Sequence, residues 1–89
     1  MKTLKTEFAK LEVKSLSDQM GKIREEFLEF ETATGYQDRI EEAFDLLQAT
    51  VTYINLAVDA TGSNIRKYNK KHLAKMKHYA DIKRVRLAK

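Results

Sequence analysis

The segment DRIEEAFDLLQATVTYINLAVDATG, residues 38–62, decides the fold. Apolar residues recur in it at spacings of three and four, which is the period of an α-helix. These residues are Ile40, Ala43, Phe44, Leu47, Val51, Ile54 and Val58. We expect Asp38 to cap the start of this helix and Thr61-Gly62 to end it.

The same segment is apolar around most of its circumference. On a helical wheel its polar residues fill a narrow strip, while Leu46, Tyr53 and Leu56 extend the apolar surface around the rest. Such a helix is buried on several sides, and the other helices of an 89-residue chain can hardly cover it. We therefore expect an all-α fold, a short helical-bundle protomer completed by oligomerisation, with a dimer as the minimum.

A shorter helix precedes this segment. Ser15 or Ser17 can accept hydrogen bonds from the free N–H groups of a helix that begins near Asp18. An apolar stripe then repeats at four, three, four and three residues, and the helix should end near Thr34-Gly35. The stripe consists of Leu16, Met20, Ile23, Phe27 and Phe30.

A third helix follows the central segment, opened by Ser63 or Asn64. Its apolar residues are Ile65, Tyr68, His72, Leu73, Met76 and Tyr79, and the residues between them are largely basic. The chain thus divides into an N-terminal arm (1–14), a helical domain (15–79) and a basic C-terminal tail (80–89).

Composition excludes several classes of protein. The chain has no Cys and no Pro, so it has neither a disulfide framework nor a Cys-based zinc site or nucleophile. No apolar run approaches the roughly 18 residues of a membrane span, and no apolar segment of a signal peptide follows the N-terminus. We expect a cytoplasmic protein with no membrane partner.

Charge is divided unequally along the chain. Residues 1–63 hold seven Lys/Arg against twelve Asp/Glu, a net charge of −5. Residues 64–89 hold ten Lys/Arg against the single Asp81, a net charge of +9. A basic segment of this kind is either a solvated tail or a surface that attracts phosphate.

Four acidic residues are placed unusually for surface carboxylates. Glu42 lies within the apolar arc of the central segment, and Glu26 borders the apolar stripe of the preceding helix. Glu29 follows Glu26 by three residues and Asp45 follows Glu42 by three, so each helix presents two carboxylates together. A carboxylate in an apolar arc needs a partner.

The short connection between the two helices should make these carboxylate pairs face each other. At about 6 Å and an effective dielectric near 20, each like-charge contact costs roughly 3 kcal/mol, so four converging carboxylates need a cation. Oxygen ligands without Cys or a nearby His suit Mg²⁺, with Mn²⁺ as an alternative, rather than zinc. The alternative is that these are ordinary solvated pairs; Glu42 in the apolar arc favours the metal.

The acidic pattern resembles a family signature. Two adjacent glutamates and a third three residues on, then twelve residues, then a Glu and an Asp three apart are similar to the E-E-x-x-E…E-x-x-D signature of the all-α nucleoside triphosphate pyrophosphohydrolases of the MazG and dimeric dUTPase type. The pattern is carried by Glu25, Glu26, Glu29, Glu42 and Asp45. Lys22 and Leu46-Leu47 also resemble that family, and the resemblance spans roughly Ser15 to Tyr79.

The resemblance implies Mg²⁺-dependent hydrolysis of a nucleoside triphosphate to a monophosphate and pyrophosphate, in a homo-oligomer that is a dimer or tetramer. It places Glu26, Glu29, Glu42 and Asp45 on the metal-ligand positions. Glu25 falls on an extra acidic position that orients or activates water.

Candidate substrate contacts come from all three helices. Asn69, Lys71, Lys75 and Lys77 resemble late Asn and Lys/Arg positions of the family. Lys22 is a further candidate through the resemblance, and Asn55 through its place on the polar strip of the central segment. After Lys77 the chain departs from the pattern, which puts a C-terminal arginine contact in doubt.

Other functions compete with hydrolysis. No G-x-x-x-x-G-K-[ST] loop occurs, and neither His completes a Glu-x-x-His di-iron motif. The main alternative is a small helical oligomer whose basic last helix and tail bind nucleic-acid phosphates. A non-catalytic helical interaction module is a third option. As a hydrolase the protein would bind no specific nucleic acid.

Overall fold

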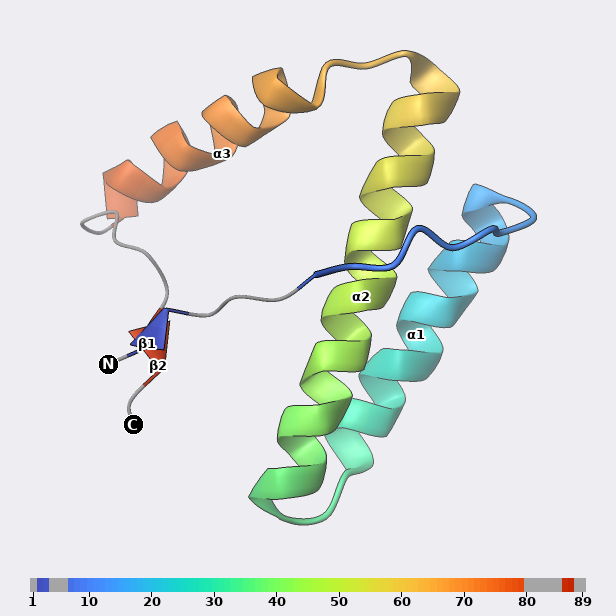
Figure 1. Cartoon of the computed structure of the whole chain (residues 1–89), viewed down its shortest axis with the longest axis vertical. Helices are drawn as coiled ribbons and strands as arrows, with labels where there is room; N and C mark the ends of the chain where they lie inside the picture. Colours follow the sequence, from blue (N-terminus) through green and yellow to red (C-terminus); the bar gives the residue numbers. More distant parts are fainter. Residues whose placement is uncertain (1, 4–6, 80–85, 88–89) are drawn as a thin grey trace. The chain divides into compact units, whose positions relative to one another are not determined.

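The computed structural model describes residues 2–3, 7–79 and 86–87 (Figure 1). It contains three α-helices, α1 (Leu16–Thr32), α2 (Gly35–Thr61) and α3 (Ile65–Tyr79), which confirms the expected all-α class. The chain forms two units, residues 8–62 and residues 1–7 together with 63–89, and each is described by itself.

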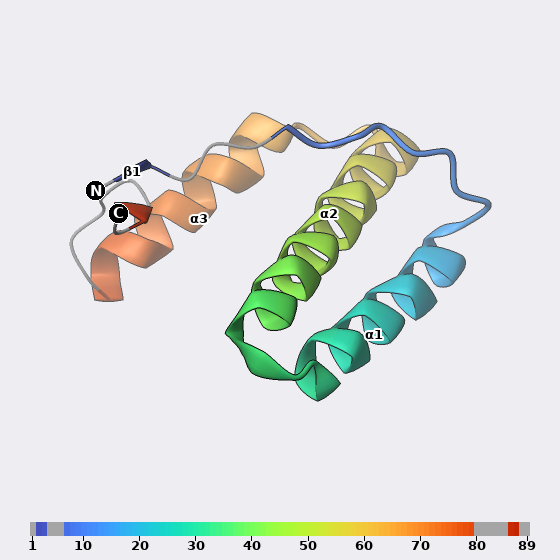
Figure 2. The same cartoon turned by 60° about the horizontal axis from the view of Figure 1, so that its bottom comes forward.

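The first unit is a hairpin of two helices that lie side by side (Figures 1 and 2). Only Ala33 and Thr34 separate α1 from α2. Gly35 has a φ of 78°, a left-handed conformation that side chains other than glycine rarely adopt, and this allows the tight reversal. The Arg39 guanidinium donates to the carbonyl of Ala33 at 3.1 Å and closes the turn.

The helix boundaries agree with the sequence except between α1 and α2: α1 ends at Thr32 rather than near Thr34-Gly35, because Gly35 begins α2. Ser15 caps α1 by accepting from the N–H of Asp18 at 3.0 Å. Gly62 ends α2 with a φ of 64°, and its N–H donates to the carbonyl of Val58. Asp38 as the cap of α2 is wrong: Gly35 turns the chain into the helix three residues earlier, and Asp38 lies in the first turn, where its charge complements the helix dipole.

Polar side chains join the parts of the first unit. The Gln19 amide donates to the carbonyl of Ala49 at 2.8 Å in a buried contact between α1 and α2. The Gln48 amide donates to the carbonyl of Ala9 at 3.0 Å and accepts from its N–H at 2.9 Å. These two bonds hold the N-terminal arm, which has no regular structure over residues 8–14, against α2.

The hairpin leaves a large apolar surface uncovered. Ala49 is the one buried hydrophobic residue among those that the structure describes. The large exposed apolar side chains of α1 and α2 are Met20, Phe27, Leu28, Tyr36, Ile40, Phe44, Leu47 and Ile54. Two helices alone therefore do not make a closed core, as the wheel of the central segment predicts.

The second unit contains α3. Asn64 rather than Ser63 caps it, because its Oδ1 accepts from the N–H of Arg66 at 2.9 Å. The strands β1 (Lys2–Thr3) and β2 (Arg86–Leu87), each two residues long, pair antiparallel and are a small departure from the all-α expectation. Apart from β2, the expected basic tail (80–89) lies outside the described residues. Among the described helices, none is both long enough and apolar enough for a membrane span.

Candidate metal centre

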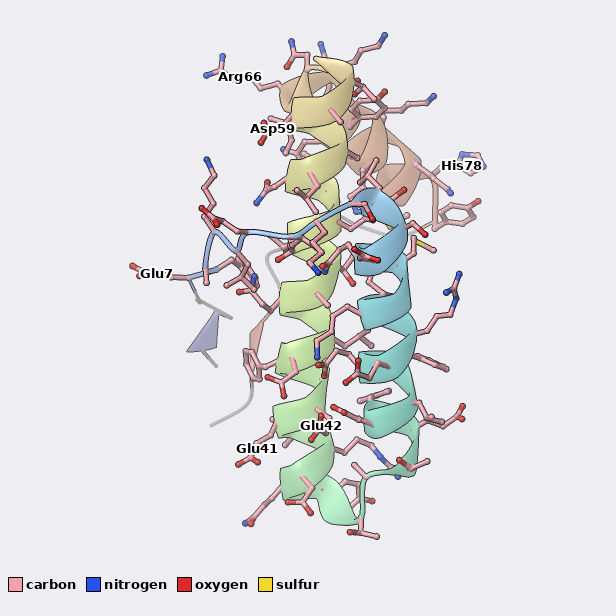
Figure 3. The ribbon with its side chains drawn as sticks, turned by 90° about the vertical axis from the view of Figure 1, so that its right-hand side faces the viewer. Glu7, Glu41, Glu42, Asp59, Arg66 and His78 are labelled. Carbon is pink, nitrogen blue, oxygen red and sulfur yellow. The ribbon has the colours of Figure 1, made fainter. Side chains whose placement is uncertain are left out.

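Acidic side chains meet where α1 and α2 face each other. Glu26 of α1 is only 7% exposed, as expected for a residue at the border of the apolar stripe. Glu42 of α2 is partly buried, whereas Asp45 is exposed. Figure 3 shows Glu42 on the side of α2 toward α1, and Glu41 on the opposite side. The two adjacent glutamates of α2 thus have different surroundings.

Two groups of three carboxylates share Glu26. One carboxylate oxygen each from Glu26, Glu42 and Asp45 lie within 4.8 Å of one another, and the same holds for Glu25, Glu26 and Glu29. The first group spans both helices and the second belongs to α1 alone. Either group can hold a metal ion, and all of its side-chain ligands would be oxygen, which suits Mg²⁺ or Mn²⁺.

Two buried oxygens distinguish this cluster from a solvated acidic surface. Oε2 of Glu26 and Oε2 of Glu42 are inaccessible to water and accept no hydrogen bond within the described part of the chain. A buried carboxylate oxygen without a partner is costly, because it has lost its hydration and gained nothing in return. A divalent cation between the helices would supply the missing interaction.

Lys22 is the cation nearest to the cluster. Its Nζ lies 2.9 Å from Oε1 of Glu26, one turn away on α1, and 3.4 Å from Oε1 of Glu25. The hydrogen bond to Glu26 raises the pKa of Lys22, with a smaller opposing effect of burial. Lys22 thus neutralises one oxygen of Glu26 and leaves the buried Oε2 without a partner.

Glu29 responds to the crowding of negative charge. Its pKa is raised, first because a protonated Glu29 can donate a hydrogen bond to the Glu26 carboxylate and then by the charge of Glu26. Desolvation and the charges of Glu42 and Glu25 act in the same direction. The charge of Glu42 on α2 therefore also raises the pKa of Glu29 on α1. It does so although Glu29 is not within the compact group that contains Glu42 and Asp45.

This shift predicts how the stability of the metal-free protein depends on pH. The folded state holds the Glu29 proton more tightly than the unfolded state does, so Glu29 lowers the free energy of unfolding as pH rises from about 4.5 through its folded pKa. Glu29→Gln should flatten this decrease, measured as the difference in melting temperature between the two proteins at each pH in EDTA. A wild-type protein that gains stability relative to Glu29→Gln over this range would contradict the prediction.

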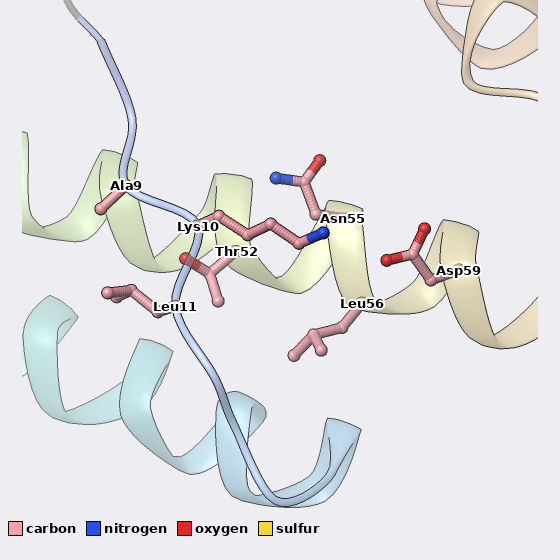
Figure 4. A pocket seen from close by; sticks show the side chains of 7 residues that line it. All are labelled: Ala9, Lys10, Leu11, Thr52, Asn55, Leu56 and Asp59. Carbon is pink, nitrogen blue, oxygen red and sulfur yellow. The ribbon is translucent and has the colours of Figure 1, made fainter.

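The structure brings together some predicted site residues and leaves others apart. All five predicted acidic residues enter one of the two groups, but no single group contains all four predicted ligands. Asn55 lines a small depression between the arm and α2 (Figure 4). The lining residues are Ala9, Lys10, Leu11, Thr52, Asn55, Leu56 and Asp59. The sequence does not predict this depression. The arm is held by hydrogen bonds of its backbone at Ala9 to Gln48, and no pattern of side chains in the arm indicates that contact.

The predicted phosphate-binding residues of α3 belong to the other unit. Asn69, Lys71, Lys75 and Lys77 are all exposed. Lys71 and Lys75 are one helical turn apart and so share a face of α3. Their contact with a substrate bound at the carboxylates remains a prediction.

Comparison with known proteins adds no assignment: no protein-family model matches the chain, and no curated protein or solved structure is significantly similar to it.

Proposed function

We propose that the protein is a metal-dependent nucleoside triphosphate pyrophosphohydrolase, which converts a (d)NTP and water into a (d)NMP and pyrophosphate with Mg²⁺, or alternatively Mn²⁺. The observation that carries the proposal is the pair of buried, unpartnered oxygens on Glu26 and Glu42, one from each of two facing helices. The choice of reaction, hydrolysis to a monophosphate and pyrophosphate, rests on the similarity of the acidic pattern to the MazG-type signature.

We assign different roles to the acidic residues according to their positions. Glu26, Glu42 and Asp45 would hold the metal between the helices, and Glu29 would complete the ligand set from α1. A Mg²⁺ held there would neutralise phosphate charge and lower the pKa of a coordinated water. Glu25, exposed beside Glu26, is assigned to orienting the attacking water and accepting its proton.

Substrate contacts come from basic and amide side chains. We assign phosphate contacts to Lys22, Asn69, Lys71, Lys75 and Lys77. Asn55 is assigned to the sugar or a base edge, because it is exposed on the polar strip of α2. It is ten residues from Asp45 on α2, or about 15 Å along the axis, a span comparable to an extended nucleoside triphosphate.

The proposal includes a homo-oligomer, a dimer or a tetramer, with the centre lined in part by a neighbouring chain. The supporting observation is the exposed apolar surface of α2, which includes Phe44, Leu47 and Ile54. A monomer with such a surface would be prone to association.

The test is a panel of canonical and modified (d)NTPs with Mg²⁺, assayed for pyrophosphate. At least one should yield pyrophosphate and a monophosphate together, and EDTA should stop the reaction. Asn55→Ala, assayed on the same panel, should change the preference among bases or sugars more than the maximal rate. Release of orthophosphate alone, or no turnover of any nucleotide, would contradict the proposal.

Binding of nucleic acid is the second candidate function, and the charge of α3 favours it. This helix carries six Lys/Arg and no acidic residue. None of these six side chains forms an ion pair with another residue in the described ranges. Their charge is therefore available to an external phosphate.

If α3 serves nucleotide phosphates, its binding to duplex DNA should be weak and independent of sequence. Such binding rests on counterion release and should disappear between about 50 and 200 mM salt. Fluorescence anisotropy with two unrelated duplexes measures this. Nanomolar, sequence-selective binding at physiological salt would instead favour the nucleic-acid function and reduce the acidic centre to a structural ion site.

A further inference from the structure

Lys22 partly compensates the negative charge of the acidic centre in the absence of a metal. Its ammonium makes its shorter contact, 2.9 Å, with Glu26, the residue that both carboxylate groups share. The Lys22 side chain is 49% exposed, whereas that of Glu26 is 10% exposed. The ammonium therefore approaches the centre from its solvent side, on a flexible stem that can withdraw.

A lysine and a divalent cation cannot both stay at Glu26 without cost. Each is attracted by the same carboxylate, and like charges a few ångströms apart repel strongly in a partly buried site. Glu26 has one oxygen on Lys22 and the other, Oε2, buried without a partner. The contact with Lys22 thus satisfies only half of the carboxylate.

We propose that Lys22 is an internal counter-ion, which stabilises the metal-free centre and must leave Glu26 when a divalent cation binds. The inference rests on the metal centre of the proposed function. It adds that Lys22 and the metal compete for Glu26. Lys22 stabilises the apo protein and weakens metal affinity. Once displaced, its ammonium is released on the solvent side, where a phosphate bound to the metal can receive it.

The experiment compares wild type with Lys22→Met by Mn²⁺ titration calorimetry and by melting in EDTA and in saturating Mn²⁺. Lys22→Met should bind Mn²⁺ about tenfold more tightly, because the competing cation is gone. It should also melt below wild type in EDTA, where Glu26 has lost its partner, and close to wild type in Mn²⁺. Neither measurement requires turnover.

Arg24→Met is the matched control. It removes the same charge from the same helix, two residues and about 200° around α1 from Lys22. Its Mn²⁺ affinity should stay within about twofold of wild type, since it removes only a remote charge. An equal gain in both variants would mean that net charge alone is responsible and would overturn the inference.

Each remaining outcome separates the inference from the proposed function. If wild type binds no Mn²⁺, the metal centre itself fails. If wild type binds Mn²⁺ and Lys22→Met binds equally or more weakly, the centre stands and the role of Lys22 is wrong. If Lys22→Met does not fold in EDTA, Lys22→Gln, which keeps a hydrogen-bond donor without the charge, takes its place with the same expected tightening.

Discussion

Glu42→Gln should lower the rate of pyrophosphate release by at least about 100-fold while making the metal-free protein more stable. The loss follows because the variant removes one proposed metal ligand from the group shared by α1 and α2, and a metal ligand supports several kcal/mol of transition-state stabilisation. The gain follows because one of several crowded negative charges disappears. Steady-state pyrophosphate release and thermal melting in EDTA measure the two effects.

The opposite signs of these two effects exclude simple unfolding as the cause of lost activity. Glu41→Gln is the matched control, since Glu41 is adjacent in sequence, exposed, and on the side of α2 away from α1 (Figure 3). It should retain activity within about twofold, as surface substitutions generally do. Equal losses in Glu41→Gln and Glu42→Gln would refute a specific role for the centre.

Ile54→Asp should dissociate or unfold the protein, with a cost of several kcal/mol for a charge buried without a partner. The structure makes this a sharp test, because Ile54 is 43% exposed in the single chain. In a monomer an Asp at such a position would be tolerated, and only a second copy that covers the site makes it costly. Light scattering at micromolar concentration and urea unfolding measure the outcome.

Asn55→Asp is the comparison for this variant. It introduces the same charge at the next residue of α2, on the polar strip, and should leave the proposed dimer or tetramer intact. A folded 10.3 kDa monomer, unchanged by Ile54→Asp and fully active, would contradict both the burial of α2 by another chain and the shared centre.

Sequence patterns predicted several helix ends because specific residues determine them. Ser15 and Asn64 act as caps through their side-chain oxygens, and Gly62 ends α2 through its left-handed backbone conformation. The start of α2 was misplaced because Thr34 makes no side-chain cap and Gly35 sets the turn through its backbone angle. The sequence indicates a helix end near Gly35, but it does not show that the same glycine also begins the next helix.

The candidate centre was predictable where helical spacing alone decides direction. Helical spacing places Glu42 within the apolar arc and Glu26 at the border of the apolar stripe, and both have a buried oxygen. The grouping of the carboxylates depends on the distance between α1 and α2. The spacing of residues along one helix does not predict that distance. The bond of Lys22 to Glu26 was also missed, because a lysine four residues before a glutamate can equally extend into solvent.

Locating a bound paramagnetic cation tests most directly whether a metal binds between α1 and α2. Backbone amide NMR signals of the wild-type protein, recorded with substoichiometric Mn²⁺, should broaden first around Glu26 and Glu29 of α1 and around Glu42 and Asp45 of α2. Excess Mg²⁺ should restore them, because both ions compete for the same oxygens. Broadening centred instead on other exposed acidic residues such as Glu12 or Glu31, or no broadening at all, would contradict a metal centre between the two helices.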